Sequence, residues 1–247
     1  MVSISQLLLK FYRGGETGQS LIGILFNPFF IARRALYQSM RRNRLFSKGD
    51  ILDIGCGKKP YISLFDHNSY IGLEVIRENG ASTADVFYNG SVLPFSNQQF
   101  DTVICSQVLE HVFEPDEFLN ELGRTLKPGG KLLLSVPFVW EEHEKPYDYA
   151  RYSSHGLHHL LSKNGFKVLT QEKLGTGAST LLQLIAAKLL ELSTPLNRYL
   201  RLVIIVLFIS PITLTGLIIS KIFPSPGNLY LDNFLVAENL QDESQFC

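Results

Sequence analysis

The stretch ILDIGCGKKPY at residues 51–61 constrains the fold of this chain more than any other. An apolar run breaks into a turn that carries Gly55 and Gly57, and glycine lets a ligand approach the backbone because it has no Cβ. The next apolar run ends in an acid, Glu74, 21 residues after Asp53. Two such runs predict neighbouring strands, with Glu74 placed to accept hydrogen bonds from two ribose hydroxyls. The pattern therefore predicts an α/β protein with a nucleoside site.

The residues around the turn favour one kind of nucleoside. A dinucleotide-binding turn has a third glycine and holds pyrophosphate at a helix N-terminus, whereas Lys58, Lys59 and Pro60 follow Gly57 here. Asp53 precedes the turn, where its carboxylate repels a pyrophosphate and attracts an ammonium group. S-adenosyl-L-methionine has an ammonium group, a ribose and no phosphate, so it fits the turn. A turn that serves only chain reversal is the alternative for this segment taken alone.

Two later segments carry a family resemblance. The chain reads TADVFYNGSVLPFSNQQFDTVICSQVLEHV from residue 83 and LKPGGKLLLSVPF from residue 126. Together with the glycine turn, these segments resemble the class I S-adenosylmethionine-dependent methyltransferases, in particular the type 11 methyltransferase domain. The resemblance covers about residues 48–172, with a closing strand at 229–237.

The resemblance implies an α/β fold with a doubly wound, mainly parallel sheet. The seven strands are expected in the order 3-2-1-4-5-7-6, with the seventh antiparallel and an apolar helical insertion between the sixth and seventh. The expected strands lie near 51–54, 70–74, 83–87, 100–105, 131–136, 166–171 and 229–236. The corresponding regions are an N-terminal amphipathic or capping region at 1–47, a cofactor-binding core at 48–172, an apolar helical insertion at 173–227, and a closing strand and tail at 228–247.

The resemblance also implies which residues bind S-adenosyl-L-methionine. The methionine-side turn would be formed by Asp53, Gly55, Cys56 and Gly57, and Glu74 would hold the ribose. Asn89 stands where the family has an aspartate against the adenine amino group, so an acceptor oxygen is kept and a charge is lost. Gln107, just after the fourth strand, would approach the methionyl end. His111 is expected to satisfy backbone groups rather than to do chemistry.

Charge and cysteine content limit the partners and the cellular compartment that we expect for the protein. The formal net charge is zero, so no global field recruits nucleic acid, and we expect no nucleic-acid partner. The cysteines, Cys56, Cys105 and Cys247, are odd in number and far apart, which is typical of packing residues in a reducing compartment. The first fifteen residues hold too short an apolar run for a signal peptide. We expect a cytoplasmic protein, or one held peripherally on the cytosolic face of a membrane.

Residues 17–49 form a basic region without Asp or Glu. Apolar residues recur at Ile31, Ala35 and Leu36, with Arg33 and Arg34 between them, which predicts an amphipathic helix. Two roles fit this helix and are compatible. It can cap the cofactor pocket with a solvated basic face, or it can face anionic lipid or a phosphorylated acceptor.

A second unusual region is the uncharged stretch at 202–220, which is long enough to span a bilayer. A single crossing would put two strands of one sheet on opposite sides of the membrane, so both ends of the insertion must stay on the same side. Pro211 and Gly216 predict that the stretch folds as two short pieces. We therefore expect a shallow contact of residues 199–223 with a membrane surface, or a homodimer face, with burial in the core as the alternative.

The acceptor chemistry is expected in the loop after the fifth strand, because ligands of such sheets bind beyond the carboxyl ends of the strands. A hydroxyl acceptor needs a general base, and His143, with Asp148 next, is our catalytic candidate. Trp140, Tyr147 and Arg151 are candidates for acceptor binding. An Asp–Arg pair that only fixes the loop is the competing interpretation of Arg151. We expect no metal, since the histidines at 155, 158 and 159 lack the spacing of a zinc site.

These features predict an S-adenosylmethionine-dependent methyltransferase that acts on a small-molecule or a lipid- or glycan-linked acceptor, through an oxygen nucleophile. The loop pattern PF.W.EHE.PYDY.RY is similar to that of methyltransferases which accompany the synthesis of cell-surface glycans and lipid-linked saccharides. A methyltransferase of a quinone or another lipid ring is the nearest alternative. A non-catalytic, membrane-associated module that binds the cofactor is the non-enzyme alternative, which the retained Asp53 and Glu74 disfavour.

Overall fold

The computed structural model of the protein describes residues 18–76, 83–90 and 92–241 and divides into two compact units. We call Ser39–Glu172 with Asn233–Cys247 the core unit, and Met1–Gln38 with Lys173–Asp232 the helical unit. The expectations for the first fifteen residues and for Cys247 lie outside the described residues.

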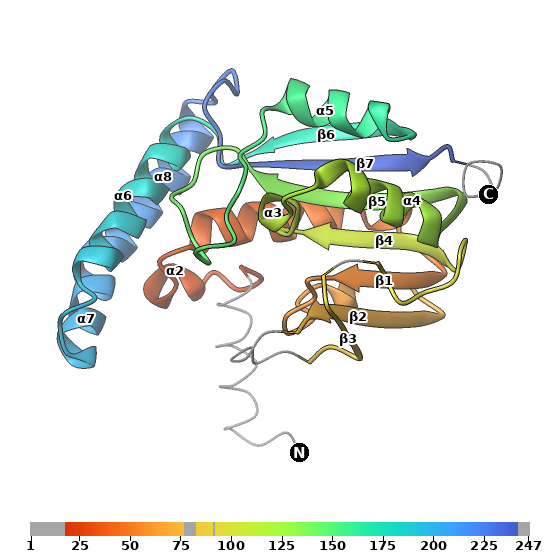
Figure 1. Ribbon diagram of the computed structural model, residues 1–247. Helices are drawn as coiled ribbons and strands as arrows, with labels where there is room; N and C mark the ends of the chain where they lie inside the picture. Colours follow the sequence, from red (N-terminus) through yellow and green to blue (C-terminus); the bar gives the residue numbers. More distant parts are fainter. Residues whose placement is uncertain (1–17, 77–82, 91, 242–247) are drawn as a thin grey trace, which may run out of the picture. The chain divides into compact units, whose positions relative to one another are not determined.

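Within the described residues, seven strands form one sheet in the order β3-β2-β1-β4-β5-β7-β6 (Figure 1). The strands are β1 (Asp50–Ile54), β2 (Ser69–Val75), β3 (Val86–Tyr88), β4 (Phe100–Ser106), β5 (Leu126–Pro137), β6 (Phe166–Leu174) and β7 (Asp232–Asn239). Neighbours from β3 to β5 run parallel, and β7 is antiparallel. The predicted fold class and strand order are confirmed. The third and last strands each begin three residues later than predicted.

The centre of the sheet is apolar on both faces, as a parallel sheet covered by helices requires. Leu52, Val103 and Leu132, which stand on β1, β4 and β5, are fully buried. In the core unit, α4 (Pro115–Thr125) starts with proline in its first turn, where no intrahelical partner is lost. The next helix, α5 (Ser154–Lys163), is capped by Ser153, because Gly156 N–H donates to Ser153 Oγ at 3.1 Å. Short 3₁₀ turns complete the unit at η1 (Arg44–Phe46), η2 (Ile62–Leu64) and η3 (Leu109–His111).

The helix α3 (Phe30–Arg42) is amphipathic, as its sequence pattern predicts. It buries Ile31 and Leu36 on one side while Arg33 is exposed on the other. At its end, in the core unit, Arg42 pairs with the carboxylate of Glu172 on β6, and Asn43 Nδ2 donates to the same carboxylate at 2.7 Å. The C-terminal end of the helix is therefore fixed to an outer strand of the sheet.

The apolar stretch folds differently from our prediction of two short pieces. In the helical unit, α7 (Arg198–Ile204), the π-helical turn η4 (Ile205–Ile209) and α8 (Ser210–Ile222) form one continuous helical run. Pro211 lies in the first turn of α8, directly after η4, so the wider turn accommodates the missing N–H without ending the helix. Gly216 brings helices together, since a Cβ there would lie 3.3 Å from Leu182 Cβ.

This run packs in the helical unit against α6 (Ala178–Leu192), and the two form a helical hairpin (Figure 1). The short helix α2 (Gly23–Phe26) contacts the same run, and Ser210 Oγ donates to Ile24 O at 2.8 Å. By length and composition, the run Arg198–Ile222 is long and apolar enough to cross a membrane. Its most apolar 18-residue window has a mean hydropathy of 2.7, and 22% of that window is buried. Its exposed large apolar side chains are Leu200, Leu202, Val203, Leu207, Phe208, Leu214, Ile218 and Ile222.

Candidate functional site

The glycine turn after β1 leaves its backbone open at one position. Gly55 and Gly57 have φ angles of +65° and +48°, which L side chains rarely adopt. Gly55 N–H donates to Leu73 O at 2.9 Å, and this hydrogen bond joins the turn to β2. A Cβ on Gly57 would meet no heavy atom within 4 Å, whereas one on Gly55 would lie 2.3 Å from Val108 Cγ2. A ligand can therefore approach at Gly57, while Gly55 serves the packing of the turn.

The predicted ribose acid lies at this turn. Glu74 stands near the end of β2, and its Oε2 accepts the Gly57 N–H at 3.1 Å. Asn89 follows β3 directly and is exposed. The ends of β1, β2 and β3 are neighbours in the sheet, so the predicted turn, acid and amide occupy adjacent strand ends. Their contacts with a nucleoside stay a prediction.

Asp53 is buried just before the turn, with 2% of its surface exposed. Its Oδ2 accepts a hydrogen bond from the Tyr70 hydroxyl at 2.6 Å. Burial raises the pKa of Asp53 to about 7, and the charge of Glu74 adds to the effect, while the hydrogen bond from Tyr70 opposes it. This carboxyl therefore changes charge near neutral pH, and a cationic group placed beside it would favour the ionised form.

The residues that follow Gly57 are also informative. Lys59, two residues after Gly57, has a φ angle of +51°, the left-handed region that glycine usually occupies. Its ammonium group pairs with Asp85, whose Oδ2 also accepts the Gly72 N–H at 2.7 Å. These bonds lower the pKa of Asp85, the hydrogen bond from Lys59 being the largest cause. The turn therefore keeps a glycine-like backbone, and the side chain of Lys59 is fixed to the residue before β3.

Gln107 lies directly after β4, with a φ angle of +59°. Its N–H donates to Ser135 O at 2.9 Å, and its Nε2 donates to Ser135 Oγ at 3.3 Å. A non-glycine residue held at positive φ beside a strand end is a sparsely populated conformation that tends to occur at functional sites. The position fits the predicted methionyl end, and the contact itself stays a prediction.

The acceptor loop, residues 138–153, is organised by an ion pair. Arg151 donates to both oxygens of Asp148, at 2.6 and 2.7 Å, and also to Glu141 O at 2.9 Å. The hydrogen bonds from Arg151 are the largest cause that lowers the pKa of Asp148, and His143 N–H donates to the same carboxylate at 2.8 Å. The side chain of Arg151 therefore serves the loop itself, which favours the loop-fixing interpretation over a contact with the acceptor.

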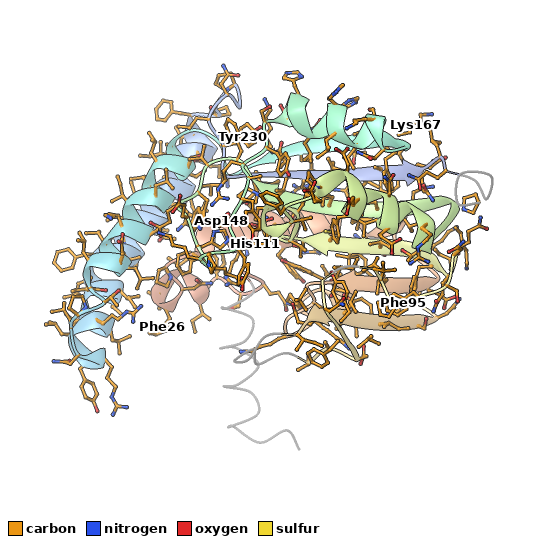
Figure 2. All side chains as sticks on the ribbon, in the orientation of Figure 1. Phe26, Phe95, His111, Asp148, Lys167 and Tyr230 are labelled. Atoms are coloured by element: carbon orange, nitrogen blue, oxygen red, sulfur yellow. The ribbon has the colours of Figure 1, made fainter. Side chains whose placement is uncertain are left out.

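The loop is also tied to the turn that follows β4. Tyr149 N–H donates to Glu110 O at 2.9 Å, and His111 Nδ1 lies 2.7 Å from Tyr147 O. The rings of His111 and His143 meet edge to face with their centroids 4.9 Å apart. Figure 2 shows His111 and Asp148 close to each other in the region where the arrows of β4 and β5 end. His111 thus bonds to a backbone carbonyl, as predicted, and it also contacts the predicted base.

Burial controls the charge of His111. Desolvation lowers the pKa of this imidazole, while the hydrogen bond to Tyr147 and the charges of Glu144 and Asp148 act in the opposite direction. Glu110, the residue before it, is completely buried, and its Oε1 lies 3.9 Å from His111 Nε2. The site therefore holds a buried carboxylate beside an imidazole that is neutral at pH 7.

The aromatic candidates of the acceptor loop are at least partly exposed. Tyr147 is exposed, Trp140 is half-buried, and both belong to the loop that carries His143. Phe113 and Tyr149 stack edge to face at 5.2 Å, and both are exposed as well. No contact of Trp140 or Tyr147 with an acceptor is established, so their roles stay predictions.

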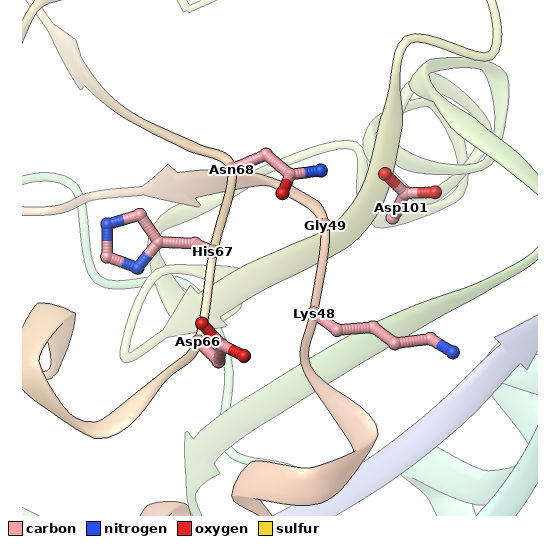
Figure 3. A pocket seen from close by; sticks show the side chains of 6 residues that line it. All are labelled: Lys48, Gly49, Asp66, His67, Asn68 and Asp101. Carbon is pink, nitrogen blue, oxygen red and sulfur yellow. The ribbon is translucent and has the colours of Figure 1, made fainter.

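Sequence reasoning did not single out Glu110 or Tyr70. Glu110 stands next to His111, and Tyr70 begins the predicted second strand and reaches Asp53 on the neighbouring strand through its hydroxyl. A hollow of about 360 Å³ lies elsewhere, at the amino ends of the strands, and Lys48, Asn68 and Asp101 are among its lining residues (Figure 3). Because ligands of open α/β sheets bind at the carboxyl ends, this hollow is not the candidate site.

Comparisons with known proteins agree with this geometry. A family model described as a methyltransferase domain matches residues 30–171, more than half of the chain. The ubiquinone/menaquinone biosynthesis C-methyltransferase UbiE of Vibrio parahaemolyticus is 35% identical over 118 residues, which are 44% of this chain and 42% of that protein. The match thus spans less than half of the relative's own length, and what the whole relative does carries over only as a proposal.

Two solved structures share the fold. Phosphoethanolamine N-methyltransferase 2 of Haemonchus contortus, in complex with phosphomonomethylethanolamine and S-adenosylhomocysteine, has a TM-score of 0.55 and 18% identity, covering 96% of this chain and 58% of that one. The [4+2]-cyclase SpnF has a TM-score of 0.51 and 17% identity, covering 84% and 81%. At these identities the likeness establishes the architecture alone.

Proposed function

This chain belongs to the methyltransferase-domain family and has the class I fold, and we propose that it transfers the methyl group of S-adenosyl-L-methionine to a hydroxyl oxygen of a lipid- or glycan-linked acceptor. The observation that carries this proposal is the placement of two imidazoles, His111 and His143, 4.9 Å apart beyond β4 and β5. Val108, three residues before His111, packs against Gly55 of the cofactor turn. The imidazoles therefore stand on the same edge of the sheet as the cofactor turn.

The reaction asks little of the protein beyond placement and a proton acceptor. A lone pair of the acceptor oxygen forms the new bond to the methyl carbon, and the sulfur–carbon bond breaks with its electron pair retained by sulfur. The hydroxyl proton passes to His143, whose imidazole is the candidate general base. Asp148 is a poor base, because the hydrogen bonds from Arg151 lower its pKa, and we propose that it positions the His143 backbone instead.

The exposed side chains of the helical unit support a membrane as the source of the acceptor. Its helical hairpin and α2 expose large apolar side chains, Leu207 and Phe208 among them, together with the basic residues Arg198 and Arg201 near the hairpin tip. Apolar side chains with flanking basic residues suit the surface of an anionic membrane. A cytosolic enzyme that rests on a membrane could receive a lipid-linked acceptor there.

A ring carbon is the second candidate for the methylated atom. It is supported by the 35% identity with UbiE, whose name states C-methylation in ubiquinone and menaquinone biosynthesis. Methylation of a hydroxylated ring carbon also benefits from a base that removes the ring hydroxyl proton, so the same imidazoles would serve. The two candidates differ in the product and not in the residues they require.

The test is methyl transfer from labelled S-adenosyl-L-methionine to membrane lipid extracts and to hydroxylated-ring lipids. We expect label in the lipid fraction, as an O-methyl group by NMR of the product, and we expect His143→Gln to lower kcat by about 10²–10⁴-fold. His155→Gln is the matched control, because this histidine is exposed on α5, outside the acceptor loop. A C-methyl product would favour the ring-carbon alternative. Cofactor binding without transfer to any lipid would favour a non-catalytic module.

A further inference from the structure

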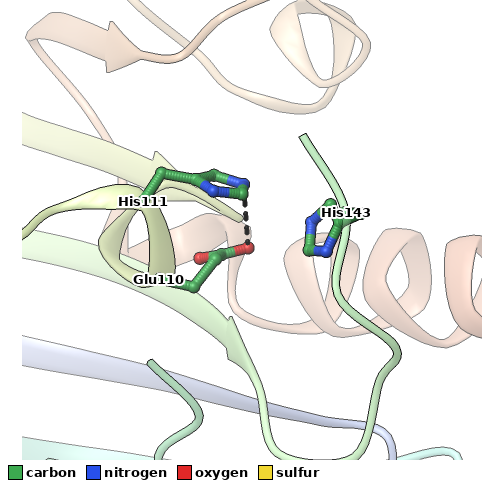
Figure 4. A group of neighbouring side chains, drawn as sticks. All are labelled: Glu110, His111 and His143. Carbon is green, nitrogen blue, oxygen red and sulfur yellow. Dashed lines mark ion pairs between the residues drawn. The ribbon is translucent and has the colours of Figure 1, made fainter. Parts of the chain in front are cut away.

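Three potential metal ligands meet in the core unit. Glu110 and His111 come from the 3₁₀ turn after β4, and His143 comes from the acceptor loop, so two separate segments contribute. One donor atom of each residue lies within 4.8 Å of those of the other two. Figure 4 shows the His143 ring facing the Glu110–His111 pair. The cluster is distinct from the exposed histidines of α5.

Both imidazoles are oriented through their Nδ1 atoms. His111 Nδ1 lies 2.7 Å from Tyr147 O, and His143 Nδ1 lies 3.3 Å from Glu141 O and from an oxygen of Asp148. In a neutral ring that donates from Nδ1, the lone pair is on Nε2. A hydrogen bond from the second ring nitrogen to a carbonyl or a carboxylate is how proteins orient histidines that bind metals.

The charges around the cluster suit a cation. Glu110 is completely buried, and Asp148 and Glu144 act on the same imidazole, while Arg151 is the cation that faces them. Three carboxylates against one guanidinium leave an excess of negative charge.

We infer that Glu110, His111 and His143 form a binding site for one first-row divalent transition-metal ion, with Zn²⁺ the best fit. Two imidazoles and one carboxylate are a ligand set of catalytic zinc sites, in which a further position stays open. Bonds of about 2.0–2.2 Å in a tetrahedral site put the ligand atoms about 3.3 Å apart, so the donors must close in by about 1.5 Å at most. The half-exposed loop that carries His143 can supply that movement.

The role of the ion rests on the proposed function, whereas its binding does not. An acceptor hydroxyl at the open position would bind the ion and lose its proton more readily, because a divalent ion lowers the pKa of bound oxygen. His143 would then be a metal ligand rather than the general base, and the hydroxyl proton would pass to solvent water. The sequence prediction of no metal considered only the spacing of histidines within one helix, and this cluster depends on the fold.

The experiment is calorimetric titration of ZnCl₂ into the full chain after removal of metal with a chelator, without cofactor. We expect one ion per chain, at least tenfold weaker binding in His111→Gln and in His143→Gln, and an unchanged affinity in His155→Gln. Co²⁺ should give the absorption bands of a four-coordinate site. MgCl₂ should give no binding comparable to Zn²⁺, because imidazole favours zinc over magnesium.

Cofactor titration of each variant separates this inference from the proposed function. Variants that keep S-adenosyl-L-methionine affinity and lose Zn²⁺ support the metal site. His143 lies on the half-exposed loop, so the His143→Gln variant still tests the metal site if a change at a more buried ligand unfolds the protein. The inference would be overturned if the natural chain did not bind Zn²⁺, or if the His111→Gln and His143→Gln variants bound Zn²⁺ as tightly as the natural chain. Mg²⁺ binding as tight as Zn²⁺ binding would also overturn it. Each of these outcomes holds whatever the methyltransferase activity.

Discussion

The carboxylate of Glu74 and the amide of Gly57 lie 3.1 Å apart, although Glu74 stands on β2 and Gly57 in the turn after β1. This contact was predictable, because an acid at the end of the second strand and glycines at the end of the first must meet at one edge of a parallel sheet. Lys59 was not predictable in the same way. Its backbone has a positive φ and its side chain pairs with Asp85, and a local sequence pattern does not reveal that contact.

We expect Glu74→Ala to weaken S-adenosyl-L-methionine binding by about 1–3 kcal/mol, because two ribose hydroxyls would lose their acceptor. Isothermal titration calorimetry measures the change. The matched control is Glu117→Ala, since that acid is exposed on α4 and should leave the affinity unaltered. An unchanged affinity in Glu74→Ala would mean that the cofactor pocket lies elsewhere.

The buried Asp53 predicts a pH dependence of folding. Its pKa is raised from 3.8 to about 7, so its contribution to the free energy of unfolding is fully present below about pH 4 and is lost as pH rises through about 7. The loss is on the order of 4 kcal/mol. Urea denaturation across this range should show the decline, and Asp53→Asn should flatten it. A stability that rises over the same window in the natural chain would contradict the assignment.

The same carboxyl also predicts a pH dependence of cofactor binding. If Asp53 faces the ammonium group, only its ionised form attracts the cofactor, so affinity should rise by up to about eightfold from about pH 6 to about pH 7.5. Titrations of the natural chain and of Asp53→Asn measure this. A parallel rise in both proteins would show that another group is responsible.

At the scale of elements, the acceptor loop shows where sequence reasoning ends. The Ser153 cap and the Asp148–Arg151 pair follow from local patterns, and both are present. The meeting of His143 with His111 requires the loop to return to the turn after β4, which depends on hydrogen bonds between distant residues. The π-helical turn before Pro211 was also not predicted, and its Ile209 packs with the distant residues Ala186 and Leu190.

The Asp148–Arg151 ion pair predicts a change that lowers the stability of the protein and leaves cofactor binding intact. In Arg151→Met the side chain of Asp148, only 3% exposed, keeps its charge without its bidentate partner, and we expect a loss of about 1–3 kcal/mol in the free energy of unfolding. Arg41→Met, at an exposed position of α3, is the control and should change little. Cofactor affinity should be retained, because its residues stand on other strand ends. A loss of cofactor binding in Arg151→Met would refute this separation.

At the scale of the whole molecule, the exposed apolar side chains of the helical unit need a partner that covers them. A single membrane crossing is incompatible with the topology, since β6 and β7 belong to one sheet and flank the hairpin in the chain. Arg198 and Arg201 lie at the hairpin tip. Charged side chains there favour a hairpin that lies along a membrane surface over one whose tip inserts into the hydrocarbon core. Exposed contiguous apolar surface of this kind usually marks an interaction site.

We expect the intact chain to sediment with membranes and with anionic vesicles. The combined variant Leu207→Gln and Phe208→Gln should remain soluble and keep its cofactor affinity, because both side chains are about 60% exposed in the helical unit. Leu45→Gln, 83% exposed in the core unit, is the matched control and should still sediment. Replacing residues 199–223 with a short Gly/Ser linker should also give a soluble protein. An intact chain that is soluble and monodisperse without detergent would rule out the membrane surface, and a dimer would then favour a homodimer face.

The placement of β6 has a consequence for how the protein is made. In the strand order, β6 neighbours only β7, and β7 emerges from the ribosome after the whole helical hairpin. The nascent chain therefore holds β6 without a sheet partner throughout synthesis of its most apolar segment, and unpaired edges and exposed apolar surface are what make incomplete chains prone to aggregation. A lipid surface that takes up the hairpin during translation would shelter this intermediate until the last strand closes the sheet.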